Sequence, residues 1–286
     1  MPKEIKKNTI LILGASGFIG NVLYKELLPY FDVFGTYCSK NEFFEQNKVF
    51  FRFCVEKDSV TKILSEVKPT YIISCILGDF KSQLKAHQEI CEYVKANHES
   101  RLLYLSSAKI FDGKSKFPSY ENNKPLAESA YGKFKISVEK MLLYDIPAQT
   151  VILRLPIILG ANSPKIFQLQ QSIKNHATFE IFPNLIISVT TANKIAQQVH
   201  YIINKNLDGI FHLASTDMIH HEDLFIEITS KIGEKLPIFK STYTSNDDSY
   251  LAILPKINKL PEAYNITVAE VVEACTLNEE ILTFKN

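Results

Sequence analysis

The sequence lacks any hydrophobic run long enough to cross a membrane. Its most apolar stretch, residues 151–159, is interrupted by Arg154 and Pro156, whereas a spanning helix needs about 20 apolar residues. The basic N-terminal segment MPKEIKKN is followed by an apolar run of only four residues, too short for a secretory signal, which needs roughly 7–15. We therefore expect a cytoplasmic protein that does not act at a membrane.

The chain also lacks an excess of charge and any cysteine pattern. Thirty-two Lys and Arg residues against 31 Asp and Glu residues leave a net charge of +1, which gives no general electrostatic reason to bind nucleic acid or an anionic membrane. Five cysteines are odd in number and scattered, and no two of them form a CxxC pair. This distribution predicts neither a disulfide framework nor a metal site, and the thiols are expected to be reduced. The cysteines are Cys38, Cys54, Cys75, Cys91 and Cys275.

The first half of the chain alternates β-rich and amphipathic helical segments, which is typical of an α/β protein. Strands are expected at 9–13, 33–37, 49–53, 71–76, 102–106 and 150–155, and helices at 18–28, from about 58, at 80–96 and at 126–143. This alternation predicts a doubly wound parallel sheet, the Rossmann fold, with right-handed crossovers.

The regular alternation of strands and helices ends after Gly160, and a smaller, interleaved substrate domain is expected there. Helices are expected at 165–175, 192–203, 221–232 and 268–282, with strands at 181–189 and 209–214. We assign residues 1–160 with 188–216 to the dinucleotide-binding domain and 161–187 with 217–286 to the smaller domain. A length of 286 residues suits this two-part division.

A glycine-rich turn directly joins the first expected strand to the first helix. The chain has only 10 glycines, and three of them fall in the seven residues GASGFIG. Gly14 allows a sharp turn, Gly17 allows the backbone to approach a pyrophosphate, and Gly20 allows the helix to pack closely on the strand. The turn predicts dinucleotide binding by Gly14, Ser16, Gly17, Phe18, Ile19 and Gly20.

The end of the second strand bears on which dinucleotide is bound. An NAD site commonly has an acidic residue at this place, but here Tyr37 and Cys38 are followed by Ser39 and Lys40. A hydroxyl and a cation suit a 2′-phosphate. We therefore expect NADP, with NAD as the second choice.

A tyrosine and a lysine on the expected helix before residue 150 could carry proton transfer. Tyr131 and Lys135 are four residues apart and so lie on one helical face. A neighbouring cation favours the phenolate and is expected to lower the pKa of Tyr131 toward neutrality. Ser106 and Ser107 end the preceding strand at the carboxyl edge of the sheet, where α/β proteins bind ligands.

Together these motifs resemble the extended short-chain dehydrogenase/reductase family. GASGFIG, the serine pair and YGKFK occur in that family's order, and the segment SSAKIFDG is most similar to the dTDP-4-dehydrorhamnose reductases and related nucleotide-sugar 4-keto reductases. The strands ILRL and GIFHLA also resemble theirs. Ala108 and Lys109 replace the acidic pair of the 4,6-dehydratases, which argues against that activity.

The resemblance implies specific roles for these residues. Tyr131 would donate a proton to the developing alkoxide, Lys135 would bind the nicotinamide ribose, and Ser107, helped by Ser106, would hydrogen-bond the substrate carbonyl. It also implies cofactor contacts from Cys75, Ile76 and Leu77 after the fourth strand and from Leu155 after the sixth. The expected substrate is a nucleotide-linked sugar with a keto group.

Two other functions stay open at this stage. An epimerase that retains NAD would use the same triad, and a dinucleotide-sensing regulatory subunit would bind cofactor without catalysis. The complete set of Tyr131, Lys135 and Ser107 weighs against the second. The sequence leaves open which sugar is bound and whether the chain forms a homodimer.

Overall fold

A seven-stranded sheet forms the centre of the computed structural model, which describes residues 8–39, 42–233, 236–243 and 246–276. Its strand order is β11-β6-β5-β4-β1-β2-β3, and the pairings among the first five strands of the chain are parallel. This confirms the expected doubly wound α/β fold. The strands are β1 (Thr9–Leu13), β2 (Asp32–Tyr37), β3 (Phe50–Arg52), β4 (Tyr71–Ser74), β5 (Arg101–Ser107), β6 (Thr150–Leu155) and β11 (Gly209–His212).

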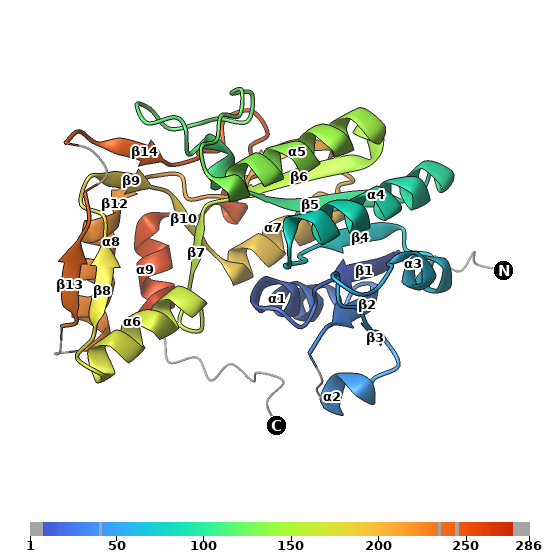
Figure 1. Cartoon of the computed structure of the whole chain (residues 1–286), viewed down its shortest axis with the longest axis horizontal. Coiled ribbons are helices and arrows are strands. Elements are labelled where there is room, and N and C mark those ends of the chain that lie inside the picture. Colours follow the sequence, from blue (N-terminus) through green and yellow to red (C-terminus); the bar gives the residue numbers. More distant parts are fainter. Residues whose placement is uncertain (1–7, 40–41, 234–235, 244–245, 277–286) are drawn as a thin grey trace. The chain divides into compact units, whose positions relative to one another are not determined.

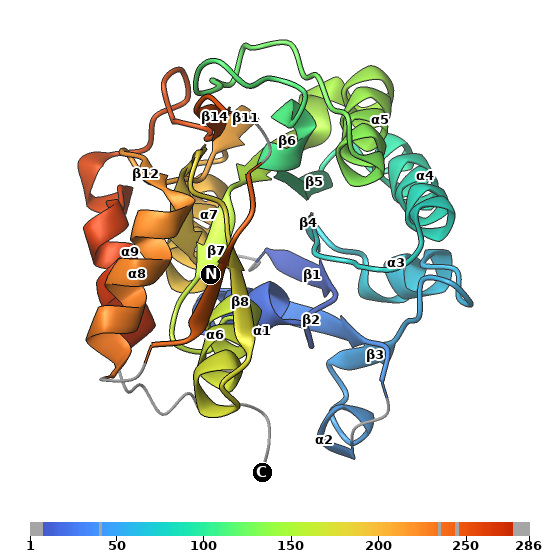
Figure 2. The same ribbon diagram turned by 60° about the vertical axis from the view of Figure 1, so that its left-hand side comes forward.

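Helices cover both faces of this sheet, which is why its central strands are apolar on both sides. In β1 every residue after Thr9 is buried. The helix α1 lies on one face, and α3 and α4 lie on the other (Figures 1 and 2). Opposite faces are expected, because right-handed crossovers lead from β1 to β2 in one direction and from β4 to β5 in the other. The helices are α1 (Phe18–Leu27), α2 (Glu42–Glu45), α3 (Thr61–Val67), α4 (Phe80–Ala96), α5 (Ala130–Asp145) and α7 (Ala192–Asn204), with the short turn η2 (Pro147–Gln149) before β6.

The chain divides into two compact units. The first contains residues up to Ser106, Ser137–Leu153 and Ala196–Ile210, and the second contains Ser107–Ile136, Arg154–Ile195 and residues from Phe211 onward.

The second unit is built from short strands and helices around its own apolar core. Phe179, Phe225 and Val271 are fully buried there, and α8 and α9 pack against each other. Three small sheets pair β10 with β7, β9 with β12 and β14, and β13 with β8. Its elements are η1 (Ala108–Phe111), β7 (Ile157–Leu159), α6 (Pro164–Lys174), β8 (Thr178–Ile181), β9 (Leu185–Ile187), β10 (Val189–Thr191), β12 (Ile219–His220), α8 (His221–Ile232), β13 (Ile238–Ser241), β14 (Ser249–Leu251), η3 (Glu262–Tyr264) and α9 (Val268–Thr276).

The observed units differ from the predicted domains chiefly at residues 107–136. These residues were expected in the dinucleotide-binding domain but cluster with the C-terminal part of the chain. The physical reason is a set of backbone contacts: Ser119 donates to the carbonyl of Ala252, and the carboxylate of Glu121 accepts from the amides of Lys256 and Ile257. Such pairing over more than 130 residues leaves no local trace in the sequence.

Two expected elements differ in the structure. The single strand expected at 181–189 is divided into the end of β8, β9 and the start of β10, because Pro183 follows Phe182 and the amide of Leu185 turns back to the carbonyl of Phe182 at 3.2 Å. The last helix, expected to end at 282, is α9, described to Thr276; residues 277–282 lie outside the described part.

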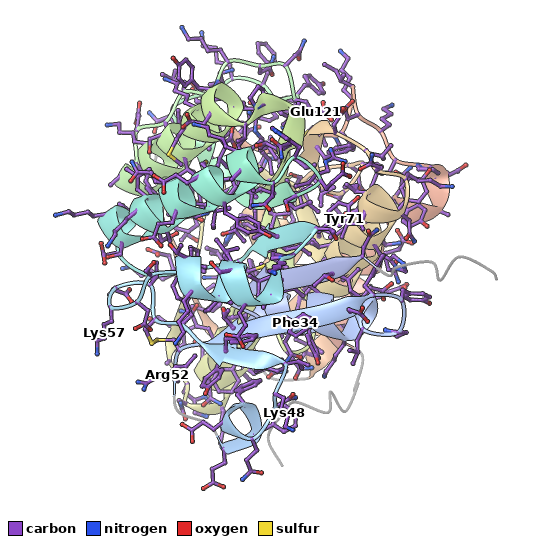
Figure 3. The ribbon with its side chains drawn as sticks, turned by 90° about the vertical axis from the view of Figure 1, so that its right-hand side faces the viewer. Phe34, Lys48, Arg52, Lys57, Tyr71 and Glu121 are labelled. Carbon is purple, nitrogen blue, oxygen red and sulfur yellow. A yellow bond between two sulfur atoms is a disulfide. The ribbon has the colours of Figure 1, made fainter. Side chains whose placement is uncertain are left out.

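The expectation of reduced, unpaired cysteines is wrong for one pair. Cys38 and Cys54 form a disulfide with a Cα–Cα distance of 4.7 Å, seen as the yellow bond near Arg52 and Lys57 in Figure 3. Cys38 directly follows β2 and Cys54 lies just beyond β3, and these two strands are neighbours in register. Parallel pairing therefore brings together two cysteines that are 16 residues apart in the sequence.

None of the helices in the described part of the chain is long and apolar enough to cross a membrane.

Candidate functional site

The glycine-rich turn adopts a backbone that requires glycine at two positions. Gly14 has a φ of 86°, and a Cβ atom there would lie 2.9 Å from the carbonyl oxygen of Cys75. A Cβ at Gly20 would lie 2.2 Å from the carbonyl oxygen of Gly14. The amide of Gly14 donates to the Thr36 hydroxyl at 2.8 Å. The turn is therefore held tightly between β1, β2 and β4.

The helix that follows the turn presents its N-terminal amides without a side-chain cap. α1 begins after Gly17, and no described side chain accepts a hydrogen bond at this N-terminus. Uncapped amides and the positive end of the helix dipole are the features that bind phosphate. These residues fit the pyrophosphate of a dinucleotide.

A cavity of about 180 Å³ opens beside this turn, entirely within the first unit. Seven of the predicted cofactor residues line it: Gly14, Ser16, Gly17, Tyr37, Cys75, Ile76 and Leu77. The other predicted residues are placed differently. Phe18, Ile19 and Gly20 form the first turn of α1, Ser39 is exposed after β2, Leu155 is buried at the end of β6 in the second unit, and Lys40 lies outside the described residues.

Sequence reasoning missed the other five residues of the cavity wall. They are Thr36, Cys38, Phe53, Val55 and Glu56. A signal was present, because the segment after the third parallel strand must end at the same edge of the sheet as the glycine turn. Glu56 supplies a carboxylate to the cavity wall. It follows β3, whereas the acidic residue of NAD sites commonly follows the second strand.

The three side chains predicted for proton transfer lie together in the second unit. The Ser107 side chain acts on the Tyr131 phenol as a hydrogen-bonding neighbour. The Lys135 side chain is buried, and its Nζ lies 5.7 Å from the centre of the Tyr131 ring. Ser107 Oγ also accepts from the amide of Lys109 at 3.2 Å, which leaves its proton to be donated to another oxygen.

A local hydrogen-bond network fixes the helix that carries Tyr131. Ser129 caps α5 by accepting from the amide of Gly132 at 3.0 Å. The carboxylate of Asp112 accepts from the Ser129 hydroxyl and from the amide of Glu128 at 2.7 Å. A Cβ at Gly132 would lie 2.2 Å from the carbonyl oxygen of Lys109, so glycine allows α5 to approach the turn that follows Ser107.

The ionisation of Tyr131 differs from the expectation. Burial raises the pKa of the Tyr131 phenol above its ordinary value, and the hydrogen bond from Ser107 offsets this only in part. The predicted shift of the Tyr131 pKa toward neutrality is therefore wrong: the pKa lies above the ordinary value of tyrosine. At neutral pH the Tyr131 hydroxyl is protonated.

Ser106, expected to help Ser107, has a different partner. It is buried, and its hydroxyl donates to the buried carboxylate of Glu139 at 2.5 Å. This contact holds β5 to the second half of α5 within the first unit. The structure thus gives Ser106 a partner in Glu139, which lies further along α5 than Tyr131.

A buried histidine lies elsewhere in the second unit. Nδ1 of His212 is 3.2 Å from the carbonyl oxygen of Leu254, and Arg154 Nη1 lies 3.4 Å from its Nε2. Burial and the Arg154 charge lower the pKa of His212 to about 3. His212 is therefore neutral at physiological pH.

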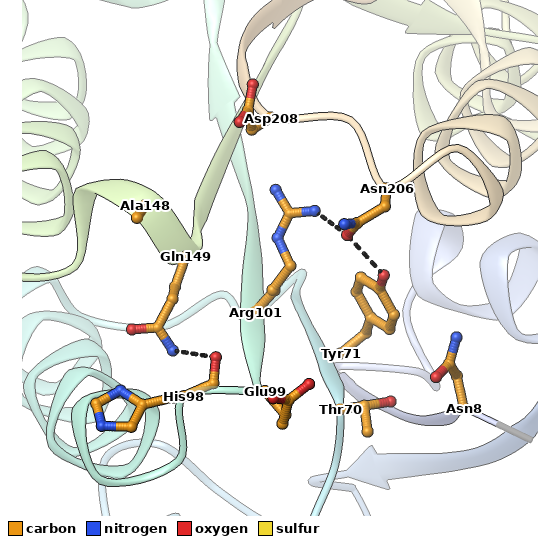
Figure 4. Close-up of a pocket in the computed structure, with 10 residues that line it drawn as sticks. All are labelled: Asn8, Thr70, Tyr71, His98, Glu99, Arg101, Ala148, Gln149, Asn206 and Asp208. Atoms are coloured by element: carbon orange, nitrogen blue, oxygen red, sulfur yellow. Dashed lines mark hydrogen bonds between the residues drawn. The ribbon is translucent and has the colours of Figure 1, made fainter. Parts of the chain in front are cut away.

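A separate cavity of about 370 Å³ lies where several strands of the large sheet begin, at the edge opposite the glycine turn. Arg101 and Tyr71 both point toward Asn206 and hydrogen-bond its side-chain oxygen (Figure 4). Arg101 also donates to the carbonyl of Leu207 at 2.9 Å. These contacts attach the first residues of β4 and β5 to the segment that follows α7.

The family model described as the RmlD substrate binding domain matches residues 8–247. The chain belongs to this family. The match includes the glycine turn as well as Ser107, Tyr131 and Lys135, and it confirms the resemblance to the reductases.

Two curated relatives are similar over different lengths. Methionine adenosyltransferase 2 subunit beta from Danio rerio is 29% identical over 164 residues, which cover 53% of this chain and 48% of the relative. The chain thus spans about half the length of that protein. The probable low-salt glycan biosynthesis reductase Agl14 from Haloferax volcanii is 21% identical over 259 residues, covering 83% of this chain and 84% of the relative.

Among solved structures, a dTDP-4-dehydrorhamnose reductase from Bacillus anthracis in complex with NADP has a TM-score of 0.75. Its sequence is 16% identical, and the match covers 93% of this chain and 98% of that chain. At this identity the likeness establishes the shared fold.

Proposed function

We propose that this protein is an NAD(P)H-dependent oxidoreductase of the short-chain dehydrogenase/reductase type that reduces a keto group on a nucleotide-linked sugar, of the 4-keto-6-deoxy type. The observation that carries the proposal is the grouping of Tyr131 with the buried Lys135, whose Nζ lies 5.7 Å from the Tyr131 ring, and with the neighbouring Ser107. Membership of the RmlD family and the reductases among the relatives support it.

The raised pKa of Tyr131 suits the direction of reduction. A proton donor must be protonated before the reaction, and burial keeps the Tyr131 phenol in that form at neutral pH. Proton transfer to the developing alkoxide leaves a phenolate. The Lys135 ammonium close to the ring and the Ser107 hydroxyl then stabilise that negative charge.

Ser107 can orient the substrate as well as Tyr131. Because its oxygen accepts from the Lys109 amide, its proton is directed to another acceptor, either the Tyr131 oxygen or a substrate carbonyl. Two hydroxyl donors on one carbonyl oxygen would polarise it for attack. When bound, the reduced nicotinamide supplies the hydride that no side chain can supply.

The glycine turn supports a dinucleotide as the cofactor. The absence of a side chain at Gly14 and Gly20 lets the turn pack closely against the backbone around it. The uncapped start of α1 suits the pyrophosphate. We propose NADP as the preferred form, with NAD second, on the basis of Ser39 and Lys40 after β2.

The test compares two tyrosines of the same helix. Tyr131→Phe should lower kcat by about 10²- to 10⁴-fold with NADPH and a panel of 4-keto nucleotide sugars, while the Kd for NADPH is unchanged. Tyr144→Phe is the matched control, because Tyr144 lies on α5 with 88% of its surface exposed, and its kcat should equal that of the wild type. Near-normal turnover by Tyr131→Phe would contradict the proposal.

The same assay separates reduction from epimerisation. A reductase oxidises one NADPH for each sugar converted, whereas an epimerase changes the sugar without net loss of nicotinamide absorbance. Product analysis alongside absorbance therefore distinguishes the two activities.

A regulatory subunit is a second candidate, favoured by the similarity to methionine adenosyltransferase 2 subunit beta. In that case the protein would bind dinucleotide and turn over no sugar of the panel. It would instead change the kinetics of a methionine adenosyltransferase catalytic subunit mixed with it.

A further inference from the structure

The disulfide lies at the wall of the cofactor cavity. Cys38 lines that cavity, and Cys54 lies between two other lining residues, Phe53 and Val55. The disulfide therefore joins the ends of β2 and β3 at the place where both border the cavity, and all of these residues belong to the first unit.

Hydrogen bonds connect the two ends of the disulfide to the rest of the cavity wall. Two residues before Cys38, the Thr36 hydroxyl accepts from the amide of Gly14 at 2.8 Å, and the Thr36 carbonyl accepts from the amide of Ser16 at 3.3 Å. A displacement of Cys38 would therefore also displace the glycine turn, because Thr36, two residues away on β2, is hydrogen-bonded to that turn.

The Cys54 end reaches the opposite wall. The amide of Cys54 donates to the carboxylate of Asp58 at 2.8 Å, which closes a tight turn over residues 54–58. Glu56, at the centre of that turn, lines the cavity and accepts from the amide of Asp79 at 3.3 Å.

The two cysteines of the disulfide differ in their exposure to solvent. Cys38 is exposed to solvent, whereas Cys54 retains only 8% exposure. Cys38 is therefore the more accessible residue of the pair to an external thiolate, and Cys54 is the buried one. Cys75, Cys91 and Cys275 take part in no disulfide in the described part of the chain.

We propose that Cys38 and Cys54 form a thiol–disulfide exchange site whose oxidised form holds the cavity in its dinucleotide-binding shape. The partner is a dithiol. One thiolate of the dithiol attacks Sγ of Cys38, the bond to Cys54 breaks, and Cys54 leaves as a thiolate that takes a proton from water. The second thiol of the dithiol attacks the mixed disulfide and releases Cys38. Two electrons pass to the protein, and the dithiol leaves as its own disulfide.

Reduction of the disulfide is expected to weaken cofactor binding, because ordering the cavity wall during binding costs free energy. With the disulfide intact, the ends of β2 and β3 are fixed before the cofactor arrives. After reduction, their side chains must be ordered on binding, which weakens affinity. The inference rests on the proposed dinucleotide-binding function, and we expect the Kd for NADPH to rise about tenfold on reduction.

The experiment uses the full chain in two redox states. Alkylation with iodoacetamide under denaturing conditions, followed by intact mass measurement, should add three groups before reduction and five after dithiothreitol, since two of the five cysteines form the disulfide. NADPH fluorescence titrations give the Kd of each state, and circular dichroism verifies that both are folded. Removal of dithiothreitol and reoxidation with glutathione disulfide should restore the original Kd.

A variant separates this pair from the other thiols. Cys38→Ser changes an exposed residue and should show the weaker Kd of the reduced wild type whether or not dithiothreitol is present. Five alkylations without reductant, or a change from three to five with an unchanged Kd, would overturn the inference alone. Absence of NADPH and NADH binding in both redox states would overturn the proposed function as well.

Discussion

Replacing Gly20 with alanine tests the packing on which the dinucleotide assignment depends. Gly20 is the third residue of α1 and is buried. A Cβ atom there would lie 2.2 Å from the carbonyl oxygen of Gly14 and 2.8 Å from Cα of Ala15. Both neighbours are backbone atoms of the glycine turn, so the contact cannot be relieved by rotating a side chain.

The size of the effect follows from two opposing contributions. Alanine within a helix is favoured over glycine by about 1 kcal/mol. Overpacking of a tight interior costs about 1–3 kcal/mol, and an overlap with backbone belongs at the upper end. We expect Gly20→Ala to lower the free energy of unfolding by about 1–2 kcal/mol. The turn must also move by roughly 1 Å to restore an ordinary contact, which should raise the Kd for NADPH by about tenfold or more.

Urea unfolding and NADPH fluorescence titration measure the two effects, and Gly233→Ala is the matched control. Gly233 follows α8 with an extended backbone, and a Cβ there would meet nothing within 4 Å. This control should bind NADPH with the wild-type Kd. If Gly20→Ala binds NADPH as tightly as the control and is equally stable, the close approach of helix and turn is refuted.

Four further variants act on other parts of the chain. Ser107→Ala should lower kcat by about tenfold or more in the NADPH oxidation assay, while Ser106→Ala should change stability more than kcat; equal kcat losses would contradict this division. Replacing Cys38 and Cys54 together with serine should lower the free energy of unfolding by about 3 kcal/mol, the value for a loop of this length, and urea unfolding of oxidised wild type and variant measures it. Because the pKa of His212 is lowered to about 3 from 6.5, the unfolded chain binds an extra proton between these values and stability falls as the pH drops through that window. His212→Gln should flatten this slope by up to about 1.4 kcal/mol per pH unit, as measured by unfolding between about pH 4 and pH 6.

The strongly patterned part of the sequence predicted the fold and one side of the cofactor cavity. Apolar runs such as TILIL are buried parallel strands, and the spacing of GASGFIG between strand and helix was sufficient to place Gly14 and Gly17 at the cavity wall. Local signals succeed here because a turn and the helix that follows it are determined by neighbouring residues.

What the sequence could not reveal depends on pairing between distant segments. The disulfide was missed because the positions of Cys38 and Cys54 are informative only once β2 and β3 are known to be adjacent and in register. The sign of the Tyr131 pKa shift was missed for a related reason, because burial outweighs the helix neighbour that the sequence shows. Gly132 could have been noticed as a lone glycine in an expected helix, which commonly marks a close approach of backbone.

The strand order also determines when the sheet can be completed during synthesis. The ribosome makes β5 before β6, and about 40 residues separate them in the sequence, yet they are neighbours in the sheet. At typical elongation rates the outer edge of β5 therefore waits on the order of seconds for its partner, exposing unpaired backbone amides and carbonyls that can pair with another chain. Any fragment that stops before β6 carries this edge permanently, so expression of the N-terminal half alone is a route to aggregation. Because β6 in turn pairs with β11, a useful division of the gene must keep the segment through β11 with the first six strands.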